Sequence, residues 1–184
     1  MCNRGWILRS EIIWHKPNAF PSSVKDRFTL DYEKLFFFVK NQKYYFEQQL
    51  DPVKEISINR AKYGWHGTKT PHNGTYAGLS GTEMMGDRYC NPKGRNKRSV
   101  WAIAAKGFKG AHFATFPEQL IEVPILAGCP ENGIVLDPFM GSGTTAVVSK
   151  RLNRNYIGIE LNGEYIKIAE KRIKGEVVGF SGLK

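Results

Sequence analysis

The sequence lacks the long apolar run of a membrane helix and a paired set of cysteines. Its longest aromatic run, Leu35 to Val39, is far shorter than the roughly 18 residues that a membrane span needs. The three cysteines, Cys2, Cys90 and Cys129, are odd in number, far apart and without zinc spacing, so we expect neither a disulfide framework nor a metal site. No apolar signal core follows the first residues, and we therefore expect a cytoplasmic protein with no membrane partner.

Acidic residues are few relative to basic ones. Lys and Arg total 27 against 17 Asp and Glu, which gives a formal net charge of +10. Hydrophobic residues at 41% and charged residues at 24% are typical of a folded globular chain. The excess of cations favours a polyanionic partner, most simply nucleic acid. The alternative is a basic protein with no such partner.

The first fifty residues are rich in strand formers. Trp6 to Trp14 predicts one strand, and Glu33 to Val39 predicts a second, nearly continuous buried strand. Tyr44 to Phe46 reads as a short neighbouring strand. His15 to Ser23 must be a loop, because two prolines and an asparagine interrupt any regular element.

The middle of the chain, Asp51 to Arg98, is rich in Gly, Asn, Thr, His and Lys and has little periodicity. An irregular segment of this length is usually functional or disordered. Its Lys and Arg offer affinity for phosphates, and its Asn, His and Thr offer donors and acceptors to base edges. It ends in a basic cluster formed by Arg88, Lys93, Arg95, Lys97 and Arg98.

Beyond this segment regular elements return. Val100 to Ile103 is a short strand candidate, and Pro117 suits the first turn of a helix that Pro124 should kink or end. Ile134 to Asp137 predicts a buried parallel strand. A glycine turn, a helix and a second strand at Tyr156 to Glu160 then form a right-handed βαβ unit, and Asn162 can cap a final helix.

The glycine turn carries the clearest sign of a ligand. Glycines permit a tight bend, and the free N–H groups at a helix start attract a carboxylate or phosphate. Glu160 lies 19 residues after Gly141 and can accept hydrogen bonds from the hydroxyls of a ribose. Gly141, Gly143 and Ala146 spell GxGxxA, typical of NAD enzymes, but S-adenosylmethionine fits the same geometry. The spacing does not choose between them, and a turn that only packs helix on strand is the plain structural alternative.

Several motifs together resemble the β class of the DNA amino-methyltransferases, which methylate the exocyclic amine of adenine or cytosine. Asp137 to Thr145 resembles their cofactor motif, and Ala111 to Pro117 their second cofactor motif. Tyr156 to Asn162 resembles the strand with the ribose-binding acid. Glu11 to Asn18, with Val24 to Arg27, resembles the stretch after their catalytic motif. The order of these motifs matches that class.

The resemblance implies an α/β fold, an incomplete seven-stranded Rossmann-like methyltransferase sheet. Residues 1–50 would be part of the catalytic half, 51–98 the target-recognition region and 99–184 the half that binds S-adenosylmethionine. The implied partner is double-stranded DNA in a restriction–modification setting, contacted by the basic cluster. The implied cofactor pocket comprises Phe113, Thr115, Pro117, Asp137, Phe139, Gly141, Gly143, Thr144 and Glu160.

The sequence departs from the family at the catalytic motif, an Asp, Asn or Ser followed by two prolines and an aromatic residue. The chain has nine prolines, and no two are adjacent. Two tripeptides resemble the motif but lack its second proline and its aromatic residue: Asp51-Pro52-Val53 and Asn91-Pro92-Lys93. We therefore assign no catalytic residue. We expect the strands near Val135 and Ile157 not to touch those near Ile12 and Phe37.

Three explanations of the missing motif remain open: a split enzyme whose separate partner chain supplies the catalytic half, a truncated frame, or a remnant that binds without catalysis. We expect methyl transfer to need an upstream segment. A non-catalytic, basic DNA-binding module is the alternative function.

Overall fold

The computed structural model describes residues 4–58, 91, 93–105 and 116–176 of the 184. The chain divides into two compact units, the larger formed by Met1–Gln48 with Ser99–Lys184 and the smaller by Gln49–Arg98. None of the helices in these described ranges has the length and hydrophobicity needed to cross a bilayer.

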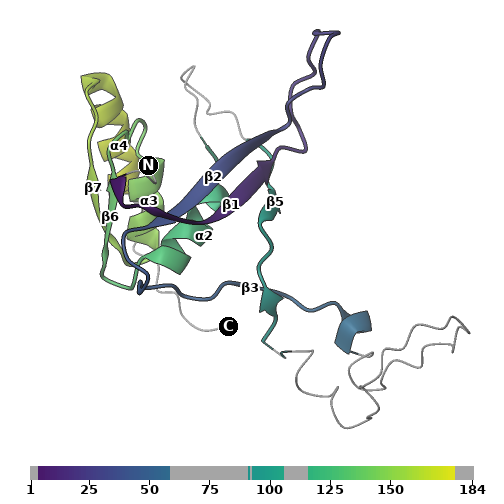
Figure 1. Ribbon diagram of the computed structural model, residues 1–184. Coiled ribbons are helices and arrows are strands. Elements are labelled where there is room, and N and C mark those ends of the chain that lie inside the picture. The colour runs from purple at the N-terminus through teal and green to yellow at the C-terminus, as the bar shows by residue number, and fades with distance from the viewer. Residues whose placement is uncertain (1–3, 59–90, 92, 106–115, 177–184) are drawn as a thin grey trace, which may run out of the picture. The chain divides into compact units, whose positions relative to one another are not determined.

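A three-stranded sheet opens the larger unit (Figure 1). Strand β1 (Ile7–His15) pairs antiparallel with β2 (Tyr32–Val39) and parallel with β5 (Val100–Ala102), giving the order β2-β1-β5. These three strands confirm the sequence prediction. The expectation that β2 is buried throughout was wrong, because only Val39 is buried and the rest is exposed or half-buried.

The predicted short strand at residues 44–46 was also wrong. This segment carries no strand, and its aromatic rings instead pack on β2, where Tyr44 and Phe46 each lie 5.7 Å from the Phe37 ring, centroid to centroid. Ring packing of this kind needs no backbone pairing, so strand-forming residues here stabilise a coil.

Helix α2 (Glu118–Gly128) packs beside both sheets of the larger unit. Its Leu120 is buried with Trp14 of β1 and Trp101 of β5, and its Ile125 is buried with Val148. Of the two predicted effects of Pro124, a kink or an end, the end is wrong, since α2 continues to Gly128 with the proline inside. Burial of the apolar face on both sides of the proline outweighs the one hydrogen bond that it removes.

The last elements form the predicted βαβ unit. Strand β6 (Ile134–Asp137) pairs in parallel with β7 (Asn155–Gly158), and α3 (Thr144–Arg151) crosses between them. Helix α4 (Gly163–Gly175) follows, and Asn162 caps it as predicted, its side chain accepting the N–H of Glu164 at 2.9 Å.

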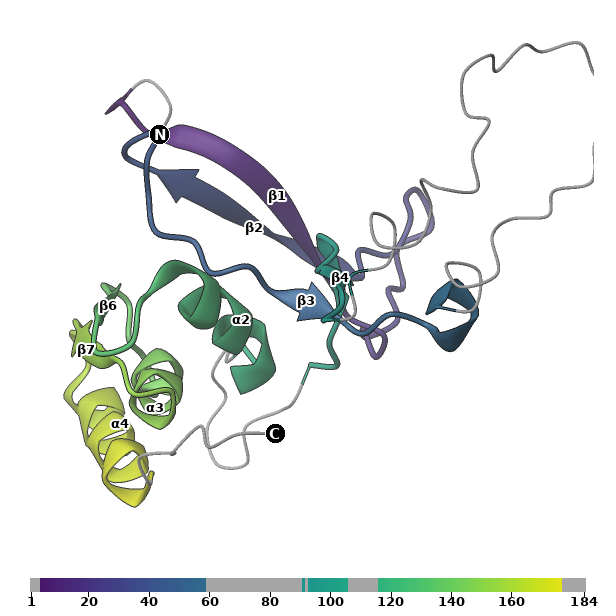
Figure 2. The ribbon, with the colours of Figure 1, turned by 90° about the horizontal axis from the view of Figure 1, so that it is seen from below.

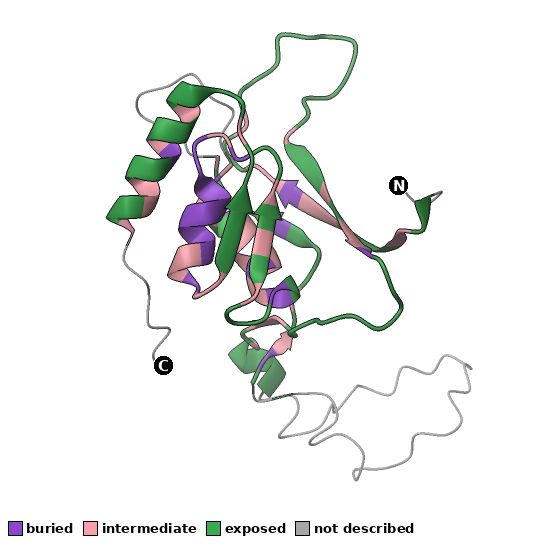
Figure 3. Ribbon diagram, turned by 90° about the vertical axis from the view of Figure 1, so that its left-hand side faces the viewer, coloured by how far each residue is buried: buried purple, intermediate pink, exposed green. Residues whose placement is uncertain are grey.

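Only one face of this two-stranded sheet is covered. Val135 packs on the buried cluster of α2 and α3, whereas Ile134 and Leu136 are 63% and 60% exposed. Figure 3 colours the two strands of this sheet largely as exposed. The expectation of a fully buried strand was therefore wrong for β6. The expectation that β6 and β7 do not touch β1 and β2 is confirmed, because they form a separate sheet.

The described part of the smaller unit, residues 49–58, 91 and 93–98, contains a short ladder. Strands β3 (Leu50–Asp51) and β4 (Arg95–Asn96) pair antiparallel and lie side by side in Figure 2. Residues 55–58 are helical. The ladder brings the two ends of the segment 51–98 together through two pairs of residues.

Candidate functional site

The turn between β6 and α3 depends on two glycines with positive φ. Gly141 has φ +52° and Gly143 has φ +83°, a region that side chains with a Cβ rarely adopt. A Cβ on Gly143 would also lie 2.8 Å from the Cβ of Ala169, so this glycine lets α4 approach the turn. A Cβ on Gly141 would meet only one atom within 4.0 Å, the Phe139 carbonyl oxygen. The turn is therefore closed toward α4 and open at Gly141.

Asp137 shapes the turn from the end of β6. Its Oδ1 accepts the N–H of Phe139 at 3.0 Å, and its Oδ2 accepts the hydroxyl of Thr145 at 2.5 Å. The carboxylate thus joins the last residue of the strand to the first turn of α3. Asp137, which the sequence predicted for this pocket, therefore connects the end of β6 to both the turn and α3.

Glu160 lies just after β7 and reaches the same turn. Its Oε2 accepts the N–H of Gly141 at 2.8 Å and its Oε1 accepts the N–H of Asn162 at 2.9 Å. These backbone hydrogen bonds, that of Asn162 first, lower the pKa of Glu160 below its ordinary value, although burial opposes them. An ionised carboxylate has about four acceptor sites, so Glu160 can still accept hydrogen bonds from a ligand.

A second close contact sets the distance between the turn and β7. A Cβ on Gly158 would come within 2.1 Å of the Cε of Met140, so the buried Met140 side chain fills the space that this glycine leaves. The sequence analysis missed Gly158. A glycine inside a predicted strand is the signal that could have indicated a close approach of this kind.

Two large apolar side chains beside these polar groups are open to solvent. Phe139 on the turn is 88% exposed, and Leu161, next to Glu160, is 99% exposed. Exposed apolar groups next to a polar turn offer a planar ring of a ligand a surface to pack on.

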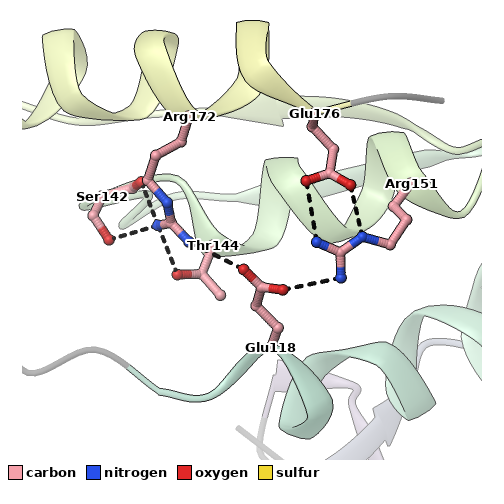
Figure 4. Close-up of polar contacts among 6 residues, drawn as sticks. All are labelled: Glu118, Ser142, Thr144, Arg151, Arg172 and Glu176. Atoms are coloured by element: carbon pink, nitrogen blue, oxygen red, sulfur yellow. Dashed lines mark hydrogen bonds and ion pairs between the residues drawn. The ribbon is translucent and has the colours of Figure 1, made fainter. Parts of the chain in front are cut away.

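A network of charged residues from α2, α3 and α4 supports the turn (Figure 4). Arg172 of α4 donates to the carbonyl oxygen of Ser142 at 2.7 Å, and its other terminal nitrogen contacts Glu118 at 3.3 Å. Arg151 of α3 donates to Glu118 at 2.9 Å and to Glu176 at 2.7 Å. Hydrogen bonds from Glu176 and Glu118 raise the pKa of Arg151, and the bond from Arg151 lowers the pKa of Glu176. The sequence analysis did not find this network.

The structure places six of the predicted pocket residues on or beside the turn: Asp137, Phe139, Gly141, Gly143, Thr144 and Glu160. Pro117 is buried at the N-cap of α2. Phe113, Thr115 and the cluster residue Arg88 lie outside the described residues.

The structure describes four residues of the basic cluster, all in the smaller unit. Lys97 donates to Asp51 at 3.1 Å across the β3–β4 ladder, and this bond is the main reason that the pKa of Asp51 is lowered. The backbone N–H of Arg98 donates to the same carboxylate at 3.4 Å. Lys93 is exposed and Arg95 is half-buried. Lys97 therefore holds the ladder together, whereas Lys93 faces solvent.

The chain matches one family model over nearly its whole length. The model, described as DNA methylase, covers residues 1–171. The Type II methyltransferase M.Cfr9I of Citrobacter freundii is 42% identical over 172 residues, which are 94% of this chain and 46% of that protein. M.SmaI of Serratia marcescens is 40% identical over 93% of this chain and 48% of its own length. The chain thus spans about half the length of these relatives.

Solved structures have the same fold. A crystal structure of the M1.HpyAVI–SAM complex has a TM-score of 0.61 and 28% identity over 93% of this chain and 64% of that one. A PvuII DNA methyltransferase, cytosine-N4-specific, has a TM-score of 0.60 and 20% identity over 91% of this chain and 51% of its own, which is evidence for the fold alone. The predicted α/β architecture, an incomplete Rossmann-like sheet, is confirmed.

Proposed function

Because the chain belongs to the DNA methylase family, we propose that it forms the cofactor- and target-binding part of a site-specific DNA methyltransferase. The proposed reaction transfers a methyl group from S-adenosylmethionine to the exocyclic amine of adenine or cytosine. The observation that carries this proposal is the bond from Gly141 to Glu160, which brings an acid and a glycine turn together at the ends of two parallel strands.

The residues at the turn fit this cofactor. The N–H groups at the start of α3 suit the carboxylate of its methionine tail, and the ionised Glu160 suits the hydroxyls of its ribose. The exposed Phe139 and Leu161 offer apolar surface to its adenine ring. When bound, the cofactor supplies an electrophilic methyl group on sulfur. The chain's own part is to bind and orient it, with Asp137 and Gly143 holding the turn in shape.

We further propose that a separate chain or segment pairs along the open side of β6 and brings the catalytic motif. In the described residues β6 pairs only with β7, and its Ile134 and Leu136 are largely exposed. An unpaired strand edge favours the addition of another strand, and the segment that brings this strand can cover the exposed apolar face beside it. The absence of adjacent prolines in this chain agrees with a catalytic motif supplied from elsewhere.

The proposed substrate is double-stranded DNA in the cytoplasm, within a restriction–modification system. Residues 51–98 would read the target, with phosphates contacted by Lys93 and its basic neighbours. The net charge of +10 supports a polyanionic partner, because cations that release counterions from DNA give affinity independent of sequence.

A binding and transfer experiment tests the proposal. Calorimetry on the full chain is expected to register S-adenosylmethionine binding, lost in Glu160→Ala. With labelled cofactor and DNA we expect no transfer by the chain alone, and transfer once the N-terminal half of the Citrobacter freundii relative is added. Binding of a nicotinamide dinucleotide in place of S-adenosylmethionine would overturn the cofactor assignment. DNA binding with no transfer under any addition would favour the non-catalytic module.

A further inference from the structure

One guanidinium reaches the glycine turn from a distant part of the chain. Arg172 lies in the last turn of α4, 30 residues from Ser142, and its Nη1 donates to the Ser142 carbonyl oxygen at 2.7 Å. The same nitrogen donates to the Ser142 hydroxyl at 3.0 Å and to the Thr144 hydroxyl at 3.2 Å. Ser142 and Thr144 are 7% and 6% exposed, so little water competes for these bonds.

The other terminal nitrogen of Arg172 binds the first residue of α2. It contacts Glu118, which also binds Arg151 through its second carboxylate oxygen at 2.9 Å (Figure 4). Glu118 is the first residue of α2 and follows directly on Pro117. Arg172 therefore contacts the glycine turn directly and the second predicted cofactor stretch through Glu118.

Arg151 belongs to the same network, but it connects helices instead of contacting the turn. It binds Glu118 and Glu176 and so fastens the end of α3 to α2 and α4. Among the described residues its side-chain hydrogen bonds go to these two carboxylates and not to the turn. The two arginines share one carboxylate but differ in whether they contact the turn, which makes Arg151 a matched control for Arg172.

We propose that Arg172 is a positioning residue for the cofactor, an inference that rests on the proposed function. Its bond to the Ser142 carbonyl fixes the peptide plane between Ser142 and Gly143, whose N–H closes the turn on the Met140 carbonyl at 2.9 Å, and so holds the backbone from which α3 starts. Because the two hydroxyls accept from Arg172, their hydrogens point away from the guanidinium. Glu118 holds the Arg172 side chain in place. Because the turn is already ordered before binding, less conformational entropy is lost when the cofactor binds.

The first test is equilibrium binding of S-adenosylmethionine to the full chain, with thermal unfolding measured alongside. We expect Arg172→Gln to weaken binding about tenfold, because the loosened turn must then be ordered when the cofactor binds. Arg151→Gln is expected to lower the melting temperature while the dissociation constant stays within about twofold. Arg172→Lys keeps the positive charge and a single donor nitrogen. It should therefore bind the cofactor more tightly than Arg172→Gln and more weakly than the parent chain.

The second test needs no cofactor. Amide hydrogen exchange at Gly143, whose N–H donates to Met140, is expected to speed up in Arg172→Gln and not in Arg151→Gln. A double-mutant cycle should find the effects of Glu118→Gln and Arg172→Gln on binding to be non-additive. The inference is overturned if Arg172→Gln binds and exchanges like the parent chain, or if Arg151→Gln loses affinity equally. A parent chain that binds no S-adenosylmethionine refutes the proposed function, and the exchange experiment then still decides whether Arg172 holds the turn.

Discussion

The carboxylate of Glu160 accepts the backbone N–H of Gly141 at 2.8 Å, although Gly141 lies in the turn after β6 and Glu160 follows β7. A group that the sequence marks as a ligand acceptor is thus also a structural support of the turn. Binding and stability are linked at this residue, because any change that removes the carboxylate removes both roles.

The pH dependence of stability should report this link. The folded-state pKa of Glu160 lies below its ordinary value of 4.5, so its carboxylate stabilises the fold fully above the unfolded-state pKa. That contribution disappears as the pH falls through the lower folded-state value. We expect the free energy of unfolding of the parent chain to exceed that of Glu160→Gln at neutral pH, with the difference shrinking on acidification.

Chemical denaturation at a series of pH values measures this difference. Subtracting the variant from the parent removes the contributions of Asp51 and Glu176, whose pKa values are also lowered. A difference that stays constant from neutral to acid pH contradicts the stabilising role of Glu160.

Gly143→Ala should be strongly destabilising. The residue has a positive φ, and its new Cβ would lie 2.8 Å from Ala169, so we expect a loss of about 2 kcal/mol or more. Gly163→Ala is the matched control in the adjoining helix, with open space and no positive φ, and should gain roughly 0.5 kcal/mol. Adding Ala169→Gly to Gly143→Ala should restore only part of the stability, because the backbone strain remains. Thermal unfolding distinguishes these three variants.

Two leucines should respond differently to truncation. Leu120 is 6% exposed between Trp14 and Trp101, and Leu120→Ala should lose about 3 kcal/mol of unfolding free energy. Leu136 is 60% exposed, and its truncation should change the stability of the isolated chain by less than about 1 kcal/mol. If a partner strand covers β6, Leu136→Ala should instead weaken transfer activity reconstituted with the N-terminal half.

Two lysines of the basic cluster should have separate effects. Lys93→Gln should lower the magnitude of the slope of log binding constant against log salt concentration by about one for DNA binding, because one phosphate contact is lost. It should leave folding unchanged. Lys97→Gln should raise the pKa of Asp51, since their hydrogen bond is the main cause of its lowering. Titration of Asp51 by NMR and DNA binding at several salt concentrations measure these effects. Equal effects of both variants on the salt slope would contradict the division of roles.

Local signals were sufficient for the C-terminal part of the fold. The strand, glycine turn, helix and second strand between Ile134 and Gly158 were predicted, as was the cap at Asn162, because hydrophobic runs, glycines and capping side chains act over a few residues. Position in the chain also predicted that Glu160 and Gly141 meet, since parallel strands end at one edge. The separation of the two sheets followed from the family's strand order.

Features that depend on contacts between residues far apart in the chain could not be predicted from the sequence. Pro124 remains inside α2 because both sides of the helix are buried, and Ile134 and Leu136 are exposed because the sheet has only two strands. The roles of Gly158 and Arg172 depend on Met140 and Ser142, far from them in the chain. By itself the sequence determined the family, the glycine turn and its acid, since these are short patterns. The tertiary structure alone decided which arginine contacts the turn, because that contact exists only once α2, α3 and α4 have packed together.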